Sequence, residues 1–316
     1  MNTKILIMSN FKEEQIQIIK EITPEAEIIA KNRKDITEKE IEQAEIIYGI
    51  PTKAQIKKAK NLKWLQLESA GADRFVDENM YQNQDVILTN SSGVYGLPIA
   101  EHVLGMILAF NKNLHKYSRQ QTENKWEELP AGKDFYGSVT GVIGLGDIGN
   151  ELARKAYTLG SKVLAVKNNP ENKPEYIEKL WGQDGIDSLL KKSDFVVVAL
   201  PLTNETREII DKSRIKQMKR DAFLVNIGRG ELIEQEALIT ALKEGWIAGA
   251  GLDVTTPEPL PEDNPLWNLD NVILTPHVSG LSPSNRYRKF DIFKDNLERY
   301  IKGENLNNVV DFEREY

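Results

Sequence analysis

The sequence predicts an α/β protein made of two doubly wound parallel-sheet domains. Short apolar runs alternate with helix-length amphipathic segments along nearly the whole chain, and this alternation is typical of parallel sheets flanked by helices. The apolar runs of the second half are nearly continuous, as expected for strands that helices cover on both faces. The chain also has 316 residues, a length typical of about two domains.

The N-terminal region is expected to form the smaller domain. In the segment 11–22, Ile16, Ile19 and Ile22 fall on one helical face. We expect helices there and at 37–44 and 53–60, and strands at 5–8, 27–30, 45–48, 63–67 and 86–89. The short strands and charged helices indicate a small open sheet.

The chain is organised around a glycine-rich turn near its middle. The apolar run 139–143 predicts a buried strand that ends at Gly144, and a helical pattern follows at once. One face of this helix is expected to carry Ile148, Leu152, Ala156 and Leu159, with Gly160 just past its end. A further strand is expected at 162–166, which completes a βαβ unit.

The turn itself has the Gly-x-Gly-x-x-Gly pattern. Gly144 would allow a tight bend, Gly146 would let the backbone approach a pyrophosphate, and Gly149 would let the helix pack closely on the strand. The helix N-terminus would supply N–H groups and a positive dipole to the phosphates. A glycine-rich turn without a ligand is the plainer alternative, but the position between strand and helix favours dinucleotide binding.

The rest of the chain extends this second sheet. We expect strands at 194–200, 222–227, 247–254 and 271–275, and helices at 187–192, 213–218 and 234–243. A final helix at about 283–302 is expected to return to the first domain. The predicted domains are therefore residues 1–97 with 284–316, and residues 98–283.

Between the two regions lies an apolar helix, expected at 98–117 and buried between the domains. The stretch 111–136 is polar and is expected to form an arm rather than core. His102 on the helix is expected to be structural, and His115 is expected to be exposed.

Composition excludes several classes of function. The net charge is −7, from 41 basic and 48 acidic residues without a long basic run, which argues against nucleic acid or an anionic membrane as partner. The absence of cysteine excludes disulfides, thiolate nucleophiles and cysteine-ligated metals, and we expect no metal site. No apolar run is long enough to span a bilayer, and the chain leads directly into a strand without a signal peptide. We expect a cytoplasmic protein.

Three strand-end segments of the second sheet carry polar groups that the fold alone does not require. Arg229 lies between two glycines after a buried strand, and its planar guanidinium suits a carboxylate or a polarised carbonyl. Glu258 is flanked by prolines that would fix the direction of its carboxylate, and His277 directly follows a strand. The alternatives are a surface arginine, a solvated glutamate and a histidine without a catalytic role.

In the first domain, the loop after residue 67 contains small residues, among them Ala70 and Gly71. Ligands of α/β sheets bind beyond the carboxyl ends of the strands. The loop therefore either exposes N–H groups to an anion or is a plain strand-to-helix turn.

Taken together, these motifs resemble those of the D-isomer-specific 2-hydroxyacid dehydrogenases over essentially the whole chain. Besides the glycine turn, the resemblance rests on Ala100-Glu101-His102, Leu200-Pro201-Leu202-Thr203-x-x-Thr206-Arg207, Asn226-Ile-Gly-Arg229-Gly, Gly251-Leu-Asp253-Val-x-x-x-Glu258-Pro and Pro276-His277-x-x-Gly280. The resemblance implies a Rossmann cofactor domain and a flavodoxin-like substrate domain. It also implies a homodimer to which the polar arm contributes.

The resemblance further implies hydride transfer between a nicotinamide and C2 of a small 2-keto or 2-hydroxy acid. Arg229 would hold the carboxylate and carbonyl of the substrate, and backbone N–H groups around Ala70 and Gly71 would bind the carboxylate as the cleft between the domains closes. His277 would donate the proton to the carbonyl oxygen in reduction and remove it in oxidation. Glu258 would hydrogen-bond His277 and favour its protonated form.

The implied cofactor is NAD(P), and Asp253 would meet the nicotinamide carboxamide. The full set of implied cofactor contacts is Gly144, Gly146, Asp147, Ile148, Lys167, Asn168, Pro201, Thr206, Ile227, Gly228, Asp253 and His277. NAD-specific Rossmann proteins place an acidic residue after the second strand, where this chain has Lys167, Asn168 and Asn169. NADP is therefore expected over NAD, although NAD bound through the backbone beside a solvated lysine is the alternative. The sequence does not explain Asp147, a negative charge within the phosphate turn.

Within the family we expect a reductase of the glyoxylate/hydroxypyruvate type, with phosphoglycerate dehydrogenase as the alternative. The lack of room for an added C-terminal regulatory domain weakens that alternative. A non-catalytic nucleotide-sensing protein on the same scaffold is disfavoured by the intact trio Arg229, Glu258 and His277, for which a methyltransferase would also have no use. An L-lactate-type dehydrogenase usually begins with its glycine turn, which here lies beyond residue 140.

Overall fold

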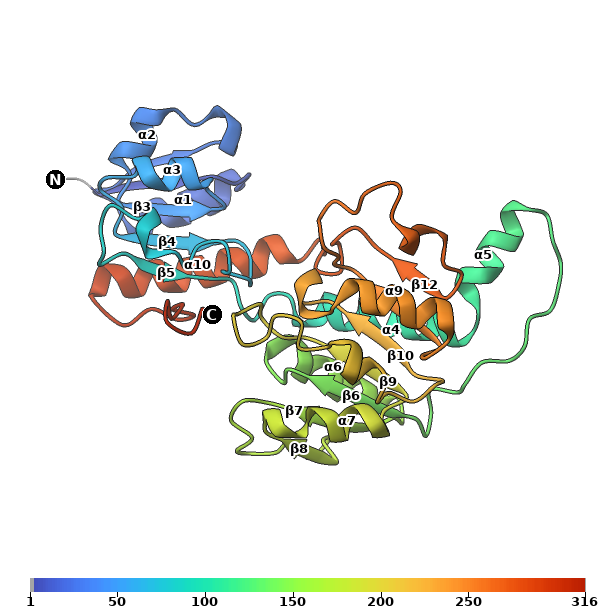
Figure 1. The fold of residues 1–316 in the computed structure, drawn as a ribbon. Helices are drawn as coiled ribbons and strands as arrows, with labels where there is room; N and C mark the ends of the chain where they lie inside the picture. Colours follow the sequence, from blue (N-terminus) through green and yellow to red (C-terminus); the bar gives the residue numbers. More distant parts are fainter. Residues whose placement is uncertain (1–2, 316) are drawn as a thin grey trace. The chain divides into compact units, whose positions relative to one another are not determined.

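The computed structural model describes residues 3–315. The chain forms two compact units, each with its own parallel sheet (Figure 1). Unit 1 consists of the chain up to Val94 together with the chain from Pro283 onward, and unit 2 is the continuous segment Tyr95–Ser282. The polypeptide therefore leaves unit 1, completes unit 2 and returns.

Unit 1 contains a five-stranded parallel sheet in the order β2-β1-β3-β4-β5. Its strands are β1 (Lys4–Ile7), β2 (Glu27–Ala30), β3 (Ile46–Gly49), β4 (Trp64–Leu67) and β5 (Ile87–Thr89). Its helices are α1 (Glu13–Ile22), α2 (Glu38–Gln43), α3 (Lys53–Lys58) and α10 (Asn285–Lys302), with short 3₁₀ turns η1 (Arg33–Asp35) and η2 (Glu78–Met80). This strand order is the flavodoxin-like order, so the predicted fold class of the first sheet is confirmed.

Helices cover both faces of this sheet. Alternate residues of β1 point to opposite faces, so Leu6 belongs to the apolar cluster under α2 and α3, while Ile5 and Ile7 belong to the cluster under α1 and α10. Phe293 and Leu297 of α10 have no exposed surface, and the final helix packs on the first sheet as predicted. After α10, the N–H of Val310 donates to the carbonyl of Leu88 at 2.8 Å and covers the β5 edge.

Unit 2 contains a seven-stranded parallel sheet in the order β12-β11-β10-β9-β6-β7-β8. Its strands are β6 (Val139–Ile143), β7 (Lys162–Val166), β8 (Lys179–Trp181), β9 (Phe195–Val198), β10 (Phe223–Asn226), β11 (Gly249–Leu252) and β12 (Val272–Leu274). Its helices are α4 (Gly96–Asn111), α5 (Leu114–Thr122), α6 (Asp147–Thr158), α7 (Ile186–Lys192), α8 (Lys212–Ile215) and α9 (Gln235–Glu244), with 3₁₀ turns η3 (Gln183–Gly185), η4 (Gly230–Leu232) and η5 (Pro265–Asn268). The order reverses between β6 and β9, as in doubly wound Rossmann sheets, which confirms the predicted class.

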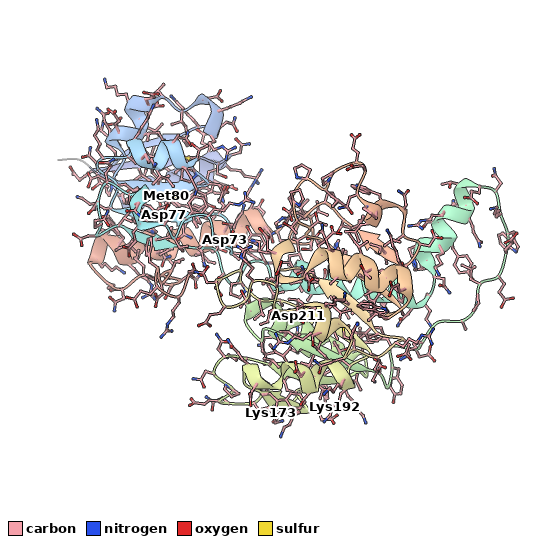
Figure 2. The ribbon with its side chains drawn as sticks, in the orientation of Figure 1. Asp73, Asp77, Met80, Lys173, Lys192 and Asp211 are labelled. Carbon is pink, nitrogen blue, oxygen red and sulfur yellow. The ribbon has the colours of Figure 1, made fainter. Side chains whose placement is uncertain are left out.

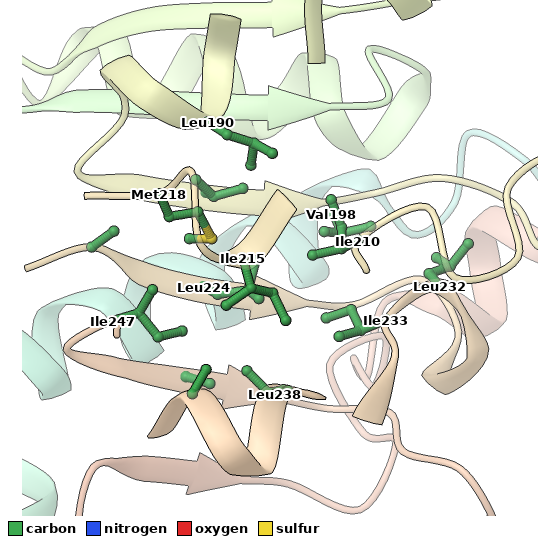
Figure 3. Packing of buried hydrophobic residues seen from close by; sticks show 14 of the residues in the cluster. Leu190, Val198, Ile210, Ile215, Met218, Leu224, Leu232, Ile233, Leu238 and Ile247 are labelled. Carbon is green, nitrogen blue, oxygen red and sulfur yellow. The ribbon is translucent and has the colours of Figure 1, made fainter. Parts of the chain in front are cut away.

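The strands of unit 2 are apolar because both faces are covered. On one face, residues of β9 and β10 such as Val198 and Leu224 pack against Leu190, Ile215 and Leu238 of α7, α8 and α9 (Figure 3). On the other face, α4 and α6 contribute Val103, Ile107 and Leu152, among others. The carboxyl ends of the strands are thereby held in one row.

Four sequence predictions were wrong in detail. Strand β8 was not predicted. The single helix expected at 98–117 is two helices, because the chain breaks at Asn113, which has a left-handed φ of 55°. Leu159, expected on the same helical face as Leu152 and Ala156, lies past the end of α6 and is 47% exposed. His115 is half-buried instead of exposed, since its ring stacks on Phe110 at 5.4 Å.

The segment from α5 to residue 138 extends from unit 2 as the predicted arm (Figure 1). Trp126 within it is fully exposed. Its far end is tied to the sheet by Lys133, whose Nζ lies 2.7 Å from carboxylate oxygens of both Asp194 and Asp221. None of the helices among the described residues is both long and apolar enough to cross a membrane.

Candidate active site

The glycine turn after β6 has the geometry predicted from its sequence. Gly144 has a φ of +102°, and a methyl group on it would lie 2.4 Å from the carbonyl oxygen of Ala199. A methyl group on Gly149 would lie 2.0 Å from the carbonyl oxygen of Gly144, so only glycine lets α6 pack this closely on the turn. At Gly146, in contrast, no described atom other than those of Gly146 itself and its chain neighbours lies within 4 Å of the corresponding position.

These features fit the pyrophosphate of a dinucleotide. The open side of Gly146 lies at the N-terminus of α6, and Gly146, the N-cap residue, has no side chain that could cap the helix. The N–H groups and dipole of a helix N-terminus favour an anion. Asp147 and Ile148 continue this first turn, while the N–H groups of Gly144 and Leu145 donate to Val166 at the end of β7, at 3.0 and 3.2 Å.

The residues after β7 would meet the adenosine ribose of such a cofactor. Lys167, Asn168 and Asn169 are all exposed, and no acidic residue lies between Lys162 and Pro170. Nε2 of Gln183 donates to Oδ1 of Asn168 at 2.9 Å. Strand β8 supports this edge through the carbonyl of Trp181, which accepts from the N–H of Lys167 at 3.0 Å. Nζ of Lys192, which is labelled in Figure 2, lies 5.6 Å from the centre of the Trp181 ring.

The loops after β9 and β10 hold several residues predicted to contact the cofactor. The hydroxyl of Thr206 donates to the carbonyl of Pro201 at 2.7 Å, so its described contacts shape the loop itself. Ile227 is only 6% exposed and joins the apolar core. A methyl group on Gly228 would lie 2.6 Å from the carbonyl oxygen of Leu200, so the two loops are in contact.

Arg229 follows β10 and is half-buried. Its Nη1 donates to the carbonyl of Gly228 at 2.8 Å. The turn is fixed by Asn226, a buried residue at the strand end, which accepts from the N–H of Gly228 at 3.1 Å and donates to the carbonyl of Arg229 at 2.8 Å. A methyl group on Gly230 would lie 2.1 Å from the carbonyl oxygen of Thr255. The arginine loop therefore packs directly on the loop that carries Glu258.

Glu258 and His277 form a hydrogen-bonded pair across neighbouring loops. Nδ1 of His277 lies 2.9 Å from Oε2 of Glu258. The other carboxylate oxygen of Glu258 accepts from the N–H of Thr255 at 3.3 Å. Since Nδ1 is held by Glu258, Nε2 is the ring nitrogen that can exchange a proton with a substrate.

Asp253, at the end of β11, holds the loop that carries His277. This residue is 2% exposed, and its carboxylate accepts from the hydroxyl of Thr275 at 2.6 Å and from the N–H groups of Val278 and Ser279 at 2.9 and 3.0 Å. Burial alone would raise the pKa of Asp253, but the hydrogen bonds from Ser279, Thr275 and Val278 outweigh it and lower that pKa. His277 adopts a left-handed φ of 54° in the loop thus fixed.

Gln235 and His102 were not predicted to belong to the site, but both support its loops. Gln235, at the start of α9, accepts from the N–H of Thr256 at 3.0 Å and donates to its carbonyl at 2.5 Å, which braces the Glu258 loop. His102 of α4 was expected to be structural, and its Nε2 lies 3.0 Å from the hydroxyl of Thr275. No local signal marks Gln235, because its partner lies in a different loop.

In unit 1, the loop after β4 presents backbone donors. The carbonyls of Ser69, Ala70 and Gly71 accept from Ser91 N–H at 2.9 Å, Asn90 Nδ2 at 2.9 Å and Ser69 Oγ at 2.7 Å. Within residues 3–315, by contrast, the N–H groups of Ala70 and Gly71 donate to no acceptor. This loop can therefore bind an anion such as a carboxylate through its backbone.

The predicted residues of unit 2 all follow carboxyl ends of strands in one sheet, which is where α/β sheets bind ligands. Comparison with known proteins agrees with this arrangement. The family described as D-isomer specific 2-hydroxyacid dehydrogenase, NAD binding domain, matches residues 104–279. A glyoxylate reductase from Korarchaeum cryptofilum is 36% identical over 262 residues, which cover 81% of this chain and 78% of that protein.

Two further relatives cover nearly the whole chain. A D-3-phosphoglycerate dehydrogenase from Methanocaldococcus jannaschii is 33% identical over 314 residues, which cover 97% of this chain but 59% of that protein. The crystal structure of a D-isomer specific 2-hydroxyacid dehydrogenase from Xanthobacter autotrophicus Py2, in complex with NADPH and MES, superposes with a TM-score of 0.85 at 28% identity and covers 100% of both chains. The chain thus belongs to the D-isomer specific 2-hydroxyacid dehydrogenase family and is an NAD(P)-dependent oxidoreductase.

Proposed function

We propose that the chain is a 2-keto acid reductase of the glyoxylate/hydroxypyruvate type that prefers NADPH. The single observation that carries the catalytic part is the pair between His277 Nδ1 and Glu258 Oε2, at 2.9 Å and at the carboxyl edge of the cofactor sheet. The pair provides a proton donor oriented by a carboxylate. The similarity to an archaeal glyoxylate reductase supports the small substrate.

In this proposal the chain binds the carboxylate of the substrate and transfers one proton to its carbonyl oxygen. The N–H groups of Ala70 and Gly71 and the guanidinium of Arg229 bind the carboxylate, and Arg229 also polarises the carbonyl. When bound, the nicotinamide supplies the hydride that C2 accepts. His277 gives the proton on Nε2 to the carbonyl oxygen, and Glu258 holds Nδ1 so that Nε2 faces the substrate. In oxidation Nε2 takes the proton back.

The proposed cofactor site uses the strand-end loops of unit 2. The glycine turn with Gly144, Gly146, Asp147 and Ile148 holds the pyrophosphate, and Lys167 and Asn168 face the ribose. The remaining proposed contacts are Pro201, Thr206, Ile227, Gly228, Asp253 and His277. In the structure, the hydroxyl of Thr206 donates to the carbonyl of Pro201 in its own loop, and the carboxylate of Asp253 accepts hydrogen bonds from the loop that carries His277.

The preference for NADPH rests on the exposed run Lys167, Asn168 and Asn169. The 2′-phosphate adds roughly two negative charges, and a partly exposed ion pair with Lys167 is worth on the order of 1 kcal/mol, or several-fold in affinity. The structure of the Xanthobacter relative contains NADPH, which supports the assignment.

Cofactor exchange tests this part of the proposal. We expect kcat/KM to be several-fold higher with NADPH than with NADH, and Lys167→Asp to reverse the order because the new carboxylate repels the 2′-phosphate. Lys162→Asp, a change of the same charge at the start of β7, is the matched control and should leave the ratio unchanged. A wild-type enzyme that favours NADH would overturn the cofactor assignment alone.

A panel of 2-keto acids tests the substrate. Glyoxylate and hydroxypyruvate should give the highest kcat/KM, and phosphohydroxypyruvate should be poor. Phosphoglycerate dehydrogenase is the second candidate, favoured by the Methanocaldococcus relative, and a preference for the phosphorylated substrate would select it. Failure to turn over any 2-keto acid with either cofactor would indicate a nucleotide-sensing protein instead.

We also propose a cytoplasmic homodimer. The arm carries large apolar side chains in solvent, with Trp126 fully exposed and Leu114 53% exposed, and such groups are typical of a surface that another copy covers. Sedimentation of the wild type should give a dimer, and Trp126→Glu should shift the equilibrium toward the monomer. A monomeric wild type at micromolar concentration would contradict this proposal.

A further inference from the structure

Asp147 is a negative charge in an unexpected place. It is the first residue of α6 and directly follows Gly146, at the turn that receives the pyrophosphate of the dinucleotide. A carboxylate near a bound pyrophosphate repels it. An acid in the first turn stabilises α6 through the helix dipole, but the glycine pattern itself requires no acid at this position.

The structure places the carboxylate against a second helix. A methyl group on Gly96, the first residue of α4, would lie 3.1 Å from Oδ1 and 3.2 Å from Oδ2 of Asp147. The N-terminus of a helix carries a positive partial charge that stabilises a nearby anion. The side chain of Tyr95, the N-cap residue of α4, does not itself form a cap hydrogen bond. The carboxylate of Asp147 places an anion beside this helix end.

The same turn of α4 also touches the loop that carries His277. A methyl group on Gly280 would lie 3.1 Å from Cδ1 of Tyr95 and 3.9 Å from Cδ1 of Ile99. Gly280 follows Ser279, whose N–H is held by Asp253. The first turn of α4 is therefore packed between the cofactor turn on one side and the His277 loop on the other.

We propose that Asp147 is a positioning residue that fastens the first turn of α4 to the cofactor turn and, through its charge, weakens the binding of the dinucleotide. The carboxylate of Asp147 contacts the N-terminus of α4, while only its backbone faces the phosphates. The negative charge of Asp147 stabilises the first turn of α4, and this turn contacts the loop that carries His277. The same charge repels the pyrophosphate and therefore lowers the affinity for the cofactor. The inference rests on dinucleotide binding at the turn and is independent of whether NAD or NADP is preferred.

Cofactor titration of charge variants tests the proposal. Asp147→Asn keeps the shape and removes the charge, so the Kd of NADPH and that of NADH, measured by nicotinamide fluorescence without substrate, should both fall about two- to five-fold. The difference from wild type should shrink in high salt, because salt screens the repulsion. Glu101→Gln is the matched control: Glu101 is an exposed acid of α4, 3.7 Å from Lys155, and its removal should leave Kd unchanged. Asp147→Ser, which also keeps an acceptor for α4 without charge, replaces Asp147→Asn if that variant does not fold.

A double-mutant cycle tests the contact with α4. Gly96→Ala should push the carboxylate toward the phosphates and raise Kd in the wild type, but it should have little effect in Asp147→Asn. Gly105→Ala lies on the same helix, and apart from its chain neighbours and the helix's own backbone no described atom lies within 4 Å of the added methyl, so it is the control for the extra methyl group. An unchanged or higher Kd in Asp147→Asn, or equal effects of Gly96→Ala in both backgrounds, would overturn the proposal.

Discussion

His277 is oriented by residues outside its own strand. Its backbone N–H donates to the carbonyl of Asp253 at 2.8 Å, its φ is left-handed at 54°, and its ring is held by Glu258 at 2.9 Å. A histidine in this conformation needs surrounding structure to hold it. The neighbouring loop therefore determines which ring nitrogen is available for chemistry.

We expect His277→Gln to lower kcat by about 10²–10⁴-fold, the usual contribution of a general acid. Glutamine can accept or donate a hydrogen bond at this site but cannot give up a proton. The Kd for the cofactor should stay within about two-fold of wild type, which would show that the turn after β6 is intact. Nearly full activity in this variant would refute the assigned role.

Arg229→Lys should act on the substrate and not on the cofactor. Lysine keeps the charge but has no planar fork, so it loses the paired hydrogen bonds to a carboxylate. We expect a higher KM for the keto acid together with a lower kcat. The control is Arg207→Lys, an exposed arginine in the loop after β9, whose kinetics should not change. If Arg229→Lys alters only the KM of the cofactor, the guanidinium has another target.

At this scale the sequence singled out the candidate catalytic residues but not the residues that support them. Arg229, Glu258 and His277 were identifiable because each follows a strand end beside glycine or proline. Gln235 could not be identified, since a glutamine at a helix start has no distinguishing pattern and its partner Thr256 lies 21 positions away.

At the scale of elements, the strands were predicted where their apolar runs are long. The run before Gly144 and the valine-rich β9 are unmistakable, whereas β8 has only three residues, Lys179–Trp181, between polar segments. The break between α4 and α5 escaped prediction because Asn113 is a residue that helices tolerate. Its left-handed conformation follows from tertiary contacts, including the bond from its Nδ2 to the carbonyl of Pro130 at 2.8 Å.

A buried carboxylate connects the arm to the central strands of unit 2. Asp194, which immediately precedes β9, accepts from the N–H of Val139 at 2.8 Å and pairs with Lys133 at 2.7 Å and Lys219 at 3.0 Å. Burial would raise the pKa of Asp194, but the bonds from Lys133, Val139 and Lys219 outweigh it, so the pKa is lowered. The charged form of Asp194 thus stabilises the folded protein.

The lowered pKa of Asp194 determines how the stability of the protein depends on pH. Because the pKa is lower in the folded state than the unfolded value of about 3.9, the stabilisation is complete above about pH 5 and is lost as the pH falls through the folded pKa. Asp194→Asn should lower the free energy of unfolding by about 2 kcal/mol at pH 7, and this difference should shrink below pH 4. Urea unfolding at several pH values measures it. Asp221→Asn, whose side chain is 61% exposed, should have a clearly smaller effect, and an equal loss at both sites would contradict the argument.

At the scale of the whole molecule, the two units have separate sheets and separate apolar cores. A ligand that binds only the native state stabilises it by about 2.7 kcal/mol at 100 times its Kd. Because all proposed nucleotide contacts lie in unit 2, we expect NADPH to slow hydrogen exchange in β6 to β12 and to leave β1 to β5 nearly unchanged. Equal protection of both sheets would show that they unfold as a single cooperative unit.

The interrupted path of the chain has a consequence for how the protein is made. A ribosome delivers the sequence from its N-terminus, so β1 to β5 emerge long before α10, whose Phe293 and Leu297 cover Tyr48 and Trp64. Until α10 has been synthesised, one apolar face of the first sheet is incompletely covered. The continuous segment Tyr95–Ser282, in contrast, can fold as soon as it emerges. Unit 2, although second in the sequence, is therefore the first that can be completed, and the nascent first sheet keeps apolar surface exposed until α10 has been synthesised.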